Sequence, residues 1–299
     1  MGDRYEAAGH TYKLDENWVD LRGSWVVSDV VTDSKGRVYA ACRENPYPEV
    51  IRGAILVFEP DGTFAGSWGE GILVTPHGLW IGPDDEIYHA DARDHTVRKF
   101  ATSGELLQTI GTPCRTGAPG QPFNMPCRAK VSKSGDLYVA DGYGQNRVHR
   151  MTLDGEAIVS WGHGDPVFTT GEGTPATGPG GFNLPHDVTV DDDDRVYVMD
   201  RENQRCQIFD NQGRYVTEWD DIGAPNDSVI DDGLIYIAGA APKSIRVMTL
   251  DGGEVSRWDE EKYPELFEGY PHGMWIDPAG SIYVAEVGAE NRLQRFVRV

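Results

Sequence analysis

The sequence predicts an all-β fold, a six-bladed β-propeller, and three observations lead to this prediction. A short pattern, an apolar residue followed by Tyr and then usually by an acidic residue three positions on, recurs six times at intervals of 39 to 59 residues. The 36 Gly and 18 Pro among 299 residues exceed the average share of roughly 12% and indicate many turns. Each repeat except the last contains four short alternating segments, which is the composition of one propeller blade.

The repeated tyrosine is expected in the second strand of each blade, and the fourth strand often ends in Trp, as at Trp68 and Trp161. The six tyrosines are Tyr39, Tyr88, Tyr138, Tyr197, Tyr236 and Tyr283. We expect one domain, residues 1–299, whose blades cover approximately residues 24–70, 71–112, 123–163, 182–220, 221–259 and 268–299.

The last repeat ends at Val299 after its third strand. Residues 12–19 are therefore expected to supply the missing fourth strand, which closes the ring and removes two exposed sheet edges. Between the blades, residues 111–123 and 162–182 are rich in Gly and Pro. Long inserts of this kind usually carry function or gate a site.

Composition narrows the classes of function. Thirty aromatic residues (8 Trp, 13 Tyr and 9 Phe) exclude a disordered chain. The net charge of −21 argues against nucleic acid or an anionic membrane as partner, and no apolar run approaches the ~18 residues of a membrane span. The first residues lack the features of a secretion signal, and the four cysteines form no CxxC pair. We therefore expect a cytoplasmic protein with reduced thiols; the oligomeric state stays open.

One position of the repeat, eleven residues before the tyrosine, carries a histidine in alternate blades. His77, His186 and His272 occupy it in blades two, four and six; the other blades have Ser28, Cys127 and, in a shorter blade five, Asn226. Alternate blades of a six-fold ring are about 120° apart, so three imidazoles are expected to converge. Three His with an open fourth position are typical of catalytic zinc, although iron or manganese would also suit imidazoles.

A second set of polar residues follows the tyrosine strand, at the same mouth of the expected propeller. Arg43 and Arg201 lie four residues after the repeat tyrosine, and Arg93 and Tyr143 lie five after it. Arginines here would suit a carboxylate, which they can bind through two hydrogen bonds; surface salt bridges are the alternative. A tyrosine beside a metal and an arginine can serve as a general base, because both cations favour the phenolate; the alternative is an aromatic side chain that only packs.

Several motifs at these positions resemble a known family. They are PHGLWI with His77, VADGYGQNRV with Tyr143, FNLPHDVTV with His186, DRENQR with Arg201, YPHGMWI with His272 and, more weakly, ACRE with Arg43. The chain resembles NHL-type propellers and, more specifically, the peptidyl-α-hydroxyglycine α-amidating lyases, from about Val30 to Arg295. This resemblance implies that the three histidines hold zinc, that Tyr143 is the base, and that Arg43 and Arg201 belong to the active site.

The sequence also departs from the family pattern. The resemblance implies a structural calcium on two backbone carbonyls, which fall near Val30 and Leu79, and on an Asp after the last His; here that residue is Gly273. Tyr270 stands where the family usually has Met, and the family's disulfide cysteines are not matched. We count Tyr270 and Arg93, with Arg43 and Arg201, as candidate substrate contacts.

These residues predict a zinc-dependent lyase that cleaves the C–N bond of a small, carboxylate-bearing α-hydroxyglycine derivative, giving an amide and glyoxylate. One alternative is a zinc hydrolase, a lactonase or amidase, built on the same three histidines. The other is a non-catalytic NHL-type scaffold that binds protein or RNA, of which the charge of −21 disfavours RNA. Release of glyoxylate without consumption of water distinguishes the lyase from the hydrolase.

Overall fold

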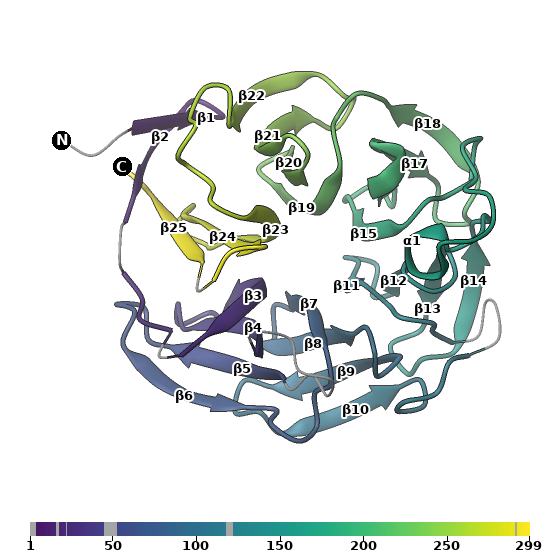
Figure 1. Ribbon diagram of the computed structural model, residues 1–299, viewed down its shortest axis with the longest axis horizontal. Coiled ribbons are helices and arrows are strands. Elements are labelled where there is room, and N and C mark those ends of the chain that lie inside the picture. Colours follow the sequence, from purple (N-terminus) through teal and green to yellow (C-terminus); the bar gives the residue numbers. More distant parts are fainter. Residues whose placement is uncertain (1–3, 16–17, 22, 45–52, 118–121, 291) are drawn as a thin grey trace. The chain divides into compact units, whose positions relative to one another are not determined.

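The computed structural model describes residues 4–15, 18–21, 23–44, 53–117, 122–290 and 292–299. Its strands form six sheets, five with four strands and one with five. These sheets are the blades of a six-bladed β-propeller, as the sequence predicts (Figure 1). Two short helical segments, α1 (Val167–Thr170) and η1 (Arg201–Asn203), interrupt the described strands. No helix within the described ranges is long and apolar enough to cross a membrane.

The chain divides into two compact units, and residues 77–225 form one of them. This unit carries blades two, three and four, in which consecutive strands pair antiparallel. Their strands are β7 (Pro76–Ile81), β8 (Glu86–Asp91), β9 (Thr96–Ala101) and β10 (Leu106–Ile110); β11 (Arg128–Val131), β12 (Leu137–Asp141), β13 (Arg147–Met151) and β14 (Ala157–Trp161); β15 (Pro185–Val190), β16 (Val196–Asp200), β17 (Arg205–Phe209) and β18 (Tyr215–Trp219).

The other unit comprises residues 1–76 and 226–299 and carries blades five, six and one. Its strands are β19 (Pro225–Asp231), β20 (Leu234–Ala240), β21 (Lys243–Thr249) and β22 (Glu254–Asp259); β23 (Tyr270–Ile276), β24 (Ile282–Val287), β25 (Leu293–Arg298), β1 (Arg4–Ala7) and β2 (His10–Leu14); β3 (Trp25–Thr32), β4 (Val38–Glu44), β5 (Gly53–Phe58) and β6 (Phe64–Trp68). The exact domain and blade boundaries stay a prediction, and residues 45–52 and 118–121 lie outside the described residues.

The N-terminal segment completes blade six, as predicted. Strand β2 pairs antiparallel with β25, Tyr12 opposite Arg298, and Figure 1 shows the purple strand beside the yellow one. The strand spans residues 10–14 rather than 12–19, and β1 adds a fifth strand that the sequence analysis missed. This extra strand forms because Tyr5 and Ala7 face inward against Trp258, whose indole nitrogen donates to the carbonyl of Glu6.

The repeat tyrosine joins its strand to the preceding turn. The hydroxyl of Tyr39 donates to Asp33 at 3.0 Å, and that of Tyr197 donates to Asp191 at 2.9 Å. Each of these aspartates also accepts backbone N–H groups of its own turn, such as that of Arg195. The Tyr283 hydroxyl likewise donates to Asp277, so the tyrosine and the turn aspartate occur together in blades one, four and six, where the aspartate satisfies the hydroxyl.

The acidic residue that ends the tyrosine strand fixes the segment entering its own blade. In blades three, four and six its carboxylate accepts the backbone N–H of the residue three positions before the Cys127, His186 or His272 position. The pairs are Asp141 with Asn124 at 2.9 Å, Asp200 with Asn183 at 2.8 Å, and Glu286 with Gly269 at 2.7 Å. The repeat pattern therefore holds in place the segments that carry the candidate ligands.

Candidate metal centre

The repeat position predicted to carry metal ligands has a common hydrogen-bonding role. In blades two, five and six the side chain at this position donates to a backbone carbonyl at, or next to, the equivalent position of the following blade. His77 Nδ1 lies 2.7 Å from the Cys127 oxygen, and His272 Nδ1 lies 2.7 Å from the Ser28 oxygen. Where the blade has Asn226 instead, the side-chain amide donates to the Pro271 oxygen at 2.7 Å. A hydrogen bond at this position is thus general, whereas the imidazole is not.

That hydrogen bond selects the tautomer of the two histidines. A carbonyl oxygen can only accept, so Nδ1 of His77 and His272 carries the proton. In the neutral imidazole Nε2 is then the unprotonated nitrogen, which is the form that binds a metal ion. Both side chains are buried and held by the backbone.

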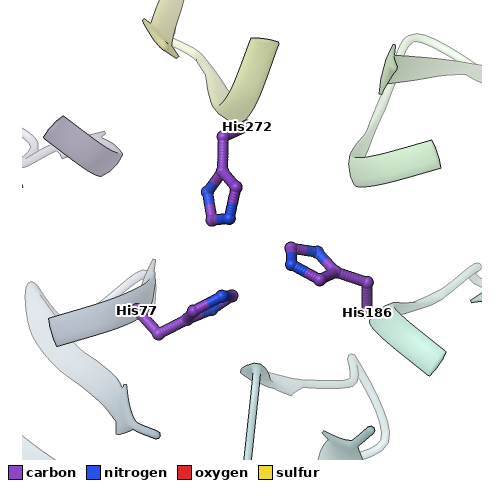
Figure 2. Close-up of side chains that lie close together, drawn as sticks. All are labelled: His77, His186 and His272. Carbon is purple, nitrogen blue, oxygen red and sulfur yellow. The ribbon is translucent and has the colours of Figure 1, made fainter. Parts of the chain in front are cut away.

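His77, His186 and His272 form a group that could hold a metal ion. Each offers one ligand atom, and these atoms all lie within 4.8 Å of one another (Figure 2). All three side chains are buried. The donor set, three imidazoles without a thiolate or carboxylate, fits a metal ion that keeps an open position for water or substrate.

Tyr143 lies in the turn after β12 and directs its hydroxyl at nitrogens of two candidate metal ligands. Its oxygen is 3.0 Å from Nε2 of His77 and 3.2 Å from Nε2 of His186. The two imidazole rings are themselves 4.8 Å apart, centroid to centroid. The hydroxyl can donate its one proton to only one nitrogen at a time. Tyr143 therefore lies within hydrogen-bond distance of both candidate ligands but donates to one of them.

Arg201 begins η1, directly after β16, and lies over aromatic rings. Its guanidinium carbon is 4.8 Å from the centre of the Phe168 ring and 5.8 Å from that of Tyr143. Nε donates to Glu202 at 2.8 Å. Within the described part of the chain, Nη1 and Nη2 have no hydrogen-bond acceptor, although 89% of the side-chain surface is covered.

The Arg201 side chain stays positively charged in this environment. Burial alone would lower its pKa, but Tyr143 and Glu202 more than offset this, and the pKa is raised above its ordinary value. Arg201 therefore presents a cation with two nitrogens that have no acceptor among the described residues, and such a pair can bind a carboxylate through two parallel hydrogen bonds.

The other predicted substrate contacts have different surroundings. Arg43 lies in β4 opposite Val26 of β3 and is partly buried. Arg93 is exposed in the turn after β8, and no contact joins it to Tyr143 or Arg201 in the ranges that the structure describes. Tyr270 begins β23 with 46% of its surface exposed, and Nζ of Lys243 lies 5.5 Å from its ring centre.

The structure gives a reason for Gly273. A Cβ atom at this position would collide with the Asp29 carboxylate and backbone. An aspartate after His272 therefore cannot be accommodated unless Asp29 moves. Val30 and Leu79, whose carbonyls the resemblance links to calcium, are buried in β3 and β7.

Two features near Tyr143 were not predicted residue by residue. The sequence analysis marked residues 162–182 as a functional insert but did not single out Phe168 or Thr169 of α1. Thr169 Oγ1 donates to the Tyr143 carbonyl at 2.5 Å, and the Phe168 ring lies 5.6 Å from that of Tyr143. The apolar segment Pro166–Phe168 inside a Gly/Pro-rich loop was the available signal. Cys127 is buried, which raises the pKa of its thiol to about 12, so its backbone carbonyl, not its sulfur, contributes here.

Comparison with known proteins places the chain in a family. The NHL repeat profile matches residues 182–209. Human "NHL repeat-containing protein 3" is 30% identical over 321 residues, covering 96% of this chain and 84% of that protein. "Peptidyl-alpha-hydroxyglycine alpha-amidating lyase 1" of Drosophila melanogaster is 33% identical over 259 residues, covering 83% of this chain and 45% of the fly protein.

A solved structure supports the fold. The "Streptogramin B lyase structure" superimposes with a TM-score of 0.59 at 13% identity, covering 99% of this chain and all of that one. At this identity the likeness concerns the fold alone. By the similarity to the human protein over most of both chains, the protein belongs to the NHL-repeat family of NHL repeat-containing protein 3, and proteins named amidating lyases are among its relatives.

Proposed function

We propose that the protein is a zinc-dependent lyase that cleaves the C–N bond of an N-acyl-α-hydroxyglycine, releasing a primary amide and glyoxylate. The observation that carries the proposal is the position of the Tyr143 hydroxyl at Nε2 of His77 and His186, with the guanidinium of Arg201 over the same tyrosine ring. Relatives named as amidating lyases support the reaction class.

In this proposal His77, His186 and His272 hold the zinc through Nε2. The backbone carbonyls of Cys127 and Ser28 orient two of the three rings and keep their protons on Nδ1. When bound, zinc supplies a Lewis acid that makes a nearby hydroxyl easier to deprotonate. The residues present fit that role, because all three are neutral ligands and leave a coordination position for substrate.

Tyr143 acts in the proposal as general base. As a phenolate it takes the proton of the substrate hydroxyl, the oxygen forms the aldehyde C=O, and the C–N bond breaks with its electron pair moving to nitrogen. The proton returns to that nitrogen, which leaves as the amide, so no water is consumed. General base catalysis contributes ~10²–10⁴-fold; binding and metal supply the remainder.

Arg201 binds the substrate carboxylate. Its two η nitrogens have no acceptor among the described residues, and its guanidinium carbon lies 5.8 Å from the Tyr143 ring centre. A carboxylate held there would place the neighbouring hydroxyl-bearing carbon close to the base. Arg43, at the equivalent position of blade one, is proposed as a second carboxylate contact on the sequence pattern. Tyr270 and Arg93 stay proposals for substrate contact on the same grounds.

The proposal is tested by product analysis. Zinc-loaded protein is incubated with an N-acyl-α-hydroxyglycine, and glyoxylate and primary amide are quantified, with His186→Ala protein as the blank for spontaneous breakdown. Equal amounts of both products above the blank are expected. Release of a carboxylic acid from an ester, lactone or amide, without glyoxylate, would instead assign a hydrolase. Absence of both activities in metal-loaded protein would leave a binding scaffold.

A further inference from the structure

Helix α1 is held beside Tyr143 by an insert that is fixed at both ends. The insert, residues 162–182, closes on itself where Phe182 N–H donates to the His163 carbonyl and His163 N–H donates to that of Gly180. Side chains of blades three and four hold the rest through backbone carbonyls of the insert. These bonds are Asn146 to Asp165, Asn203 to Ala176, Arg205 to Thr177 and Gly181, and Gln207 to Gly181.

Phe168 is the large apolar side chain that this anchored insert presents. Its ring contacts Arg201 and Tyr143, yet 54% of its surface is exposed, and none of the α1 residues is buried. Leaving more than half of such a side chain in water forgoes much of the stabilisation that its burial would provide. Packing within the protein therefore does not account for its place on a fixed element.

Phe168 adjoins the proposed carboxylate site. The ring lies on one side of the Arg201 guanidinium, whose η nitrogens have no acceptor in the described residues. A carboxylate bound to those nitrogens brings the rest of the ligand to the edge of Phe168. Such a ligand needs an apolar group to cover the ring, and an α-hydroxyglycine carries one only in its N-acyl part.

We infer that Phe168 is a specificity-determining residue that selects substrates with an apolar N-acyl group. This inference rests on the proposed function for the reaction, but it concerns binding, which can be measured without turnover. The acyl chain covers the Phe168 ring while the carboxylate pairs with Arg201. Phe168 and Arg201 contact each other, so one ligand can make both contacts at the same time.

The test compares a short and a long acyl chain in two measurements. Calorimetry gives the affinities of N-acetylglycine and N-hexanoylglycine, which lack the reactive hydroxyl, and kinetics gives kcat/KM for the corresponding α-hydroxyglycines. Wild type, Phe168→Ala, Phe168→Leu and the control Tyr215→Ala are compared; Tyr215 is an exposed aromatic residue on β18. The hexanoyl-to-acetyl ratio is used, because any loosening of Arg201 affects both ligands and cancels.

We expect wild type to favour the hexanoyl compound by about tenfold or more. Phe168→Ala should abolish most of this preference, Phe168→Leu should keep part of it, and Tyr215→Ala should leave it unchanged. A preference that survives Phe168→Ala, or none in wild type, overturns the inference even if glyoxylate is produced. A Phe168-dependent preference in binding without any glyoxylate would leave the inference standing and overturn the proposed reaction.

Discussion

The hydroxyl oxygen of Tyr143 lies 3.0 Å from Nε2 of His77. That nitrogen is the one left unprotonated by the hydrogen bond from Nδ1 to the Cys127 carbonyl. The same atom is therefore both the candidate metal ligand and the neighbour of the proposed base. Metal binding and proton transfer are therefore expected to depend on neighbouring atoms. Substitutions that remove only the tyrosine hydroxyl, or only an imidazole, can distinguish the two functions.

Tyr143→Phe separates the base from the metal. The substitution keeps the ring that packs against Phe168 and Arg201 and removes only the hydroxyl. Turnover should fall by at least ~10²-fold because the general base is lost, while metal content, measured by elemental analysis, stays the same. An unchanged rate would transfer the base role to another group and favour the hydrolase.

Replacing any one of His77, His186 or His272 by Ala tests the metal. Purified wild-type protein should contain about one transition-metal ion per chain, and each variant should lose it, because two imidazoles bind far more weakly than three. His163→Ala is the matched control, since that histidine is exposed and lies outside the group. Metal-free protein that still releases glyoxylate would end the zinc hypothesis.

Arg201→Lys tests the carboxylate site. Lysine keeps the charge but not the planar pair of donors, so kcat/KM for the acid should fall by ~10-fold or more while the fold is retained. An analogue with its carboxylate converted to an amide should be a poor substrate of wild type and lose little further in the variant. The values of kcat/KM for the two proteins with the two substrates form a double-mutant-type cycle. The coupling energy from this cycle measures the contact between Arg201 and the substrate carboxylate. Equal turnover of acid and neutral analogue would exclude an α-hydroxyglycine.

The buried imidazole of His89 is expected to make the folded protein less stable in acid, independently of the candidate metal centre. It is fully buried, both ring nitrogens lack a hydrogen-bond partner in the described residues, and burial, with a smaller effect of Arg98, lowers its pKa from 6.5 to about 3. The unfolded chain binds a proton here that the folded chain cannot. This contribution to stability is therefore complete above pH ~6.5 and decreases toward pH 3 by up to ~1.4 kcal/mol per pH unit.

His89→Leu should reduce that pH dependence. Denaturant unfolding at pH 7.5 and pH 4.5 gives the change in unfolding free energy for wild type and variant. The drop between the two pH values should be smaller in the variant by about 2.6 kcal/mol, since leucine has no proton to bind. An equal drop in both proteins would mean that His89 is protonated in the folded state. His10→Leu is a suitable control, because His10 lies at the surface beside Arg298.

The sequence alone determined the repeat architecture and the candidate ligands. The tyrosine pattern marks every blade, and in blades one, four and six the tyrosine hydroxyl donates to an aspartate six residues earlier, a pairing that is local in the chain. The same local regularity made His77, His186 and His272 stand out, since they differ in residue type from Ser28, Cys127 and Asn226 at an equivalent position. Periodic features of this kind are visible without coordinates.

Only the tertiary structure decided which side chains surround Tyr143. Phe168 and Thr169 are about 25 residues away from it in an insert that belongs to no repeat, so no periodicity could place them. The added strand β1 likewise depends on Trp258, more than 250 residues along the chain. Contacts between distant segments arise from packing and hydrogen bonds that close only in the folded chain. For that reason the sequence predicted the scaffold and the candidate ligands, and the structure supplied the environment of the proposed base.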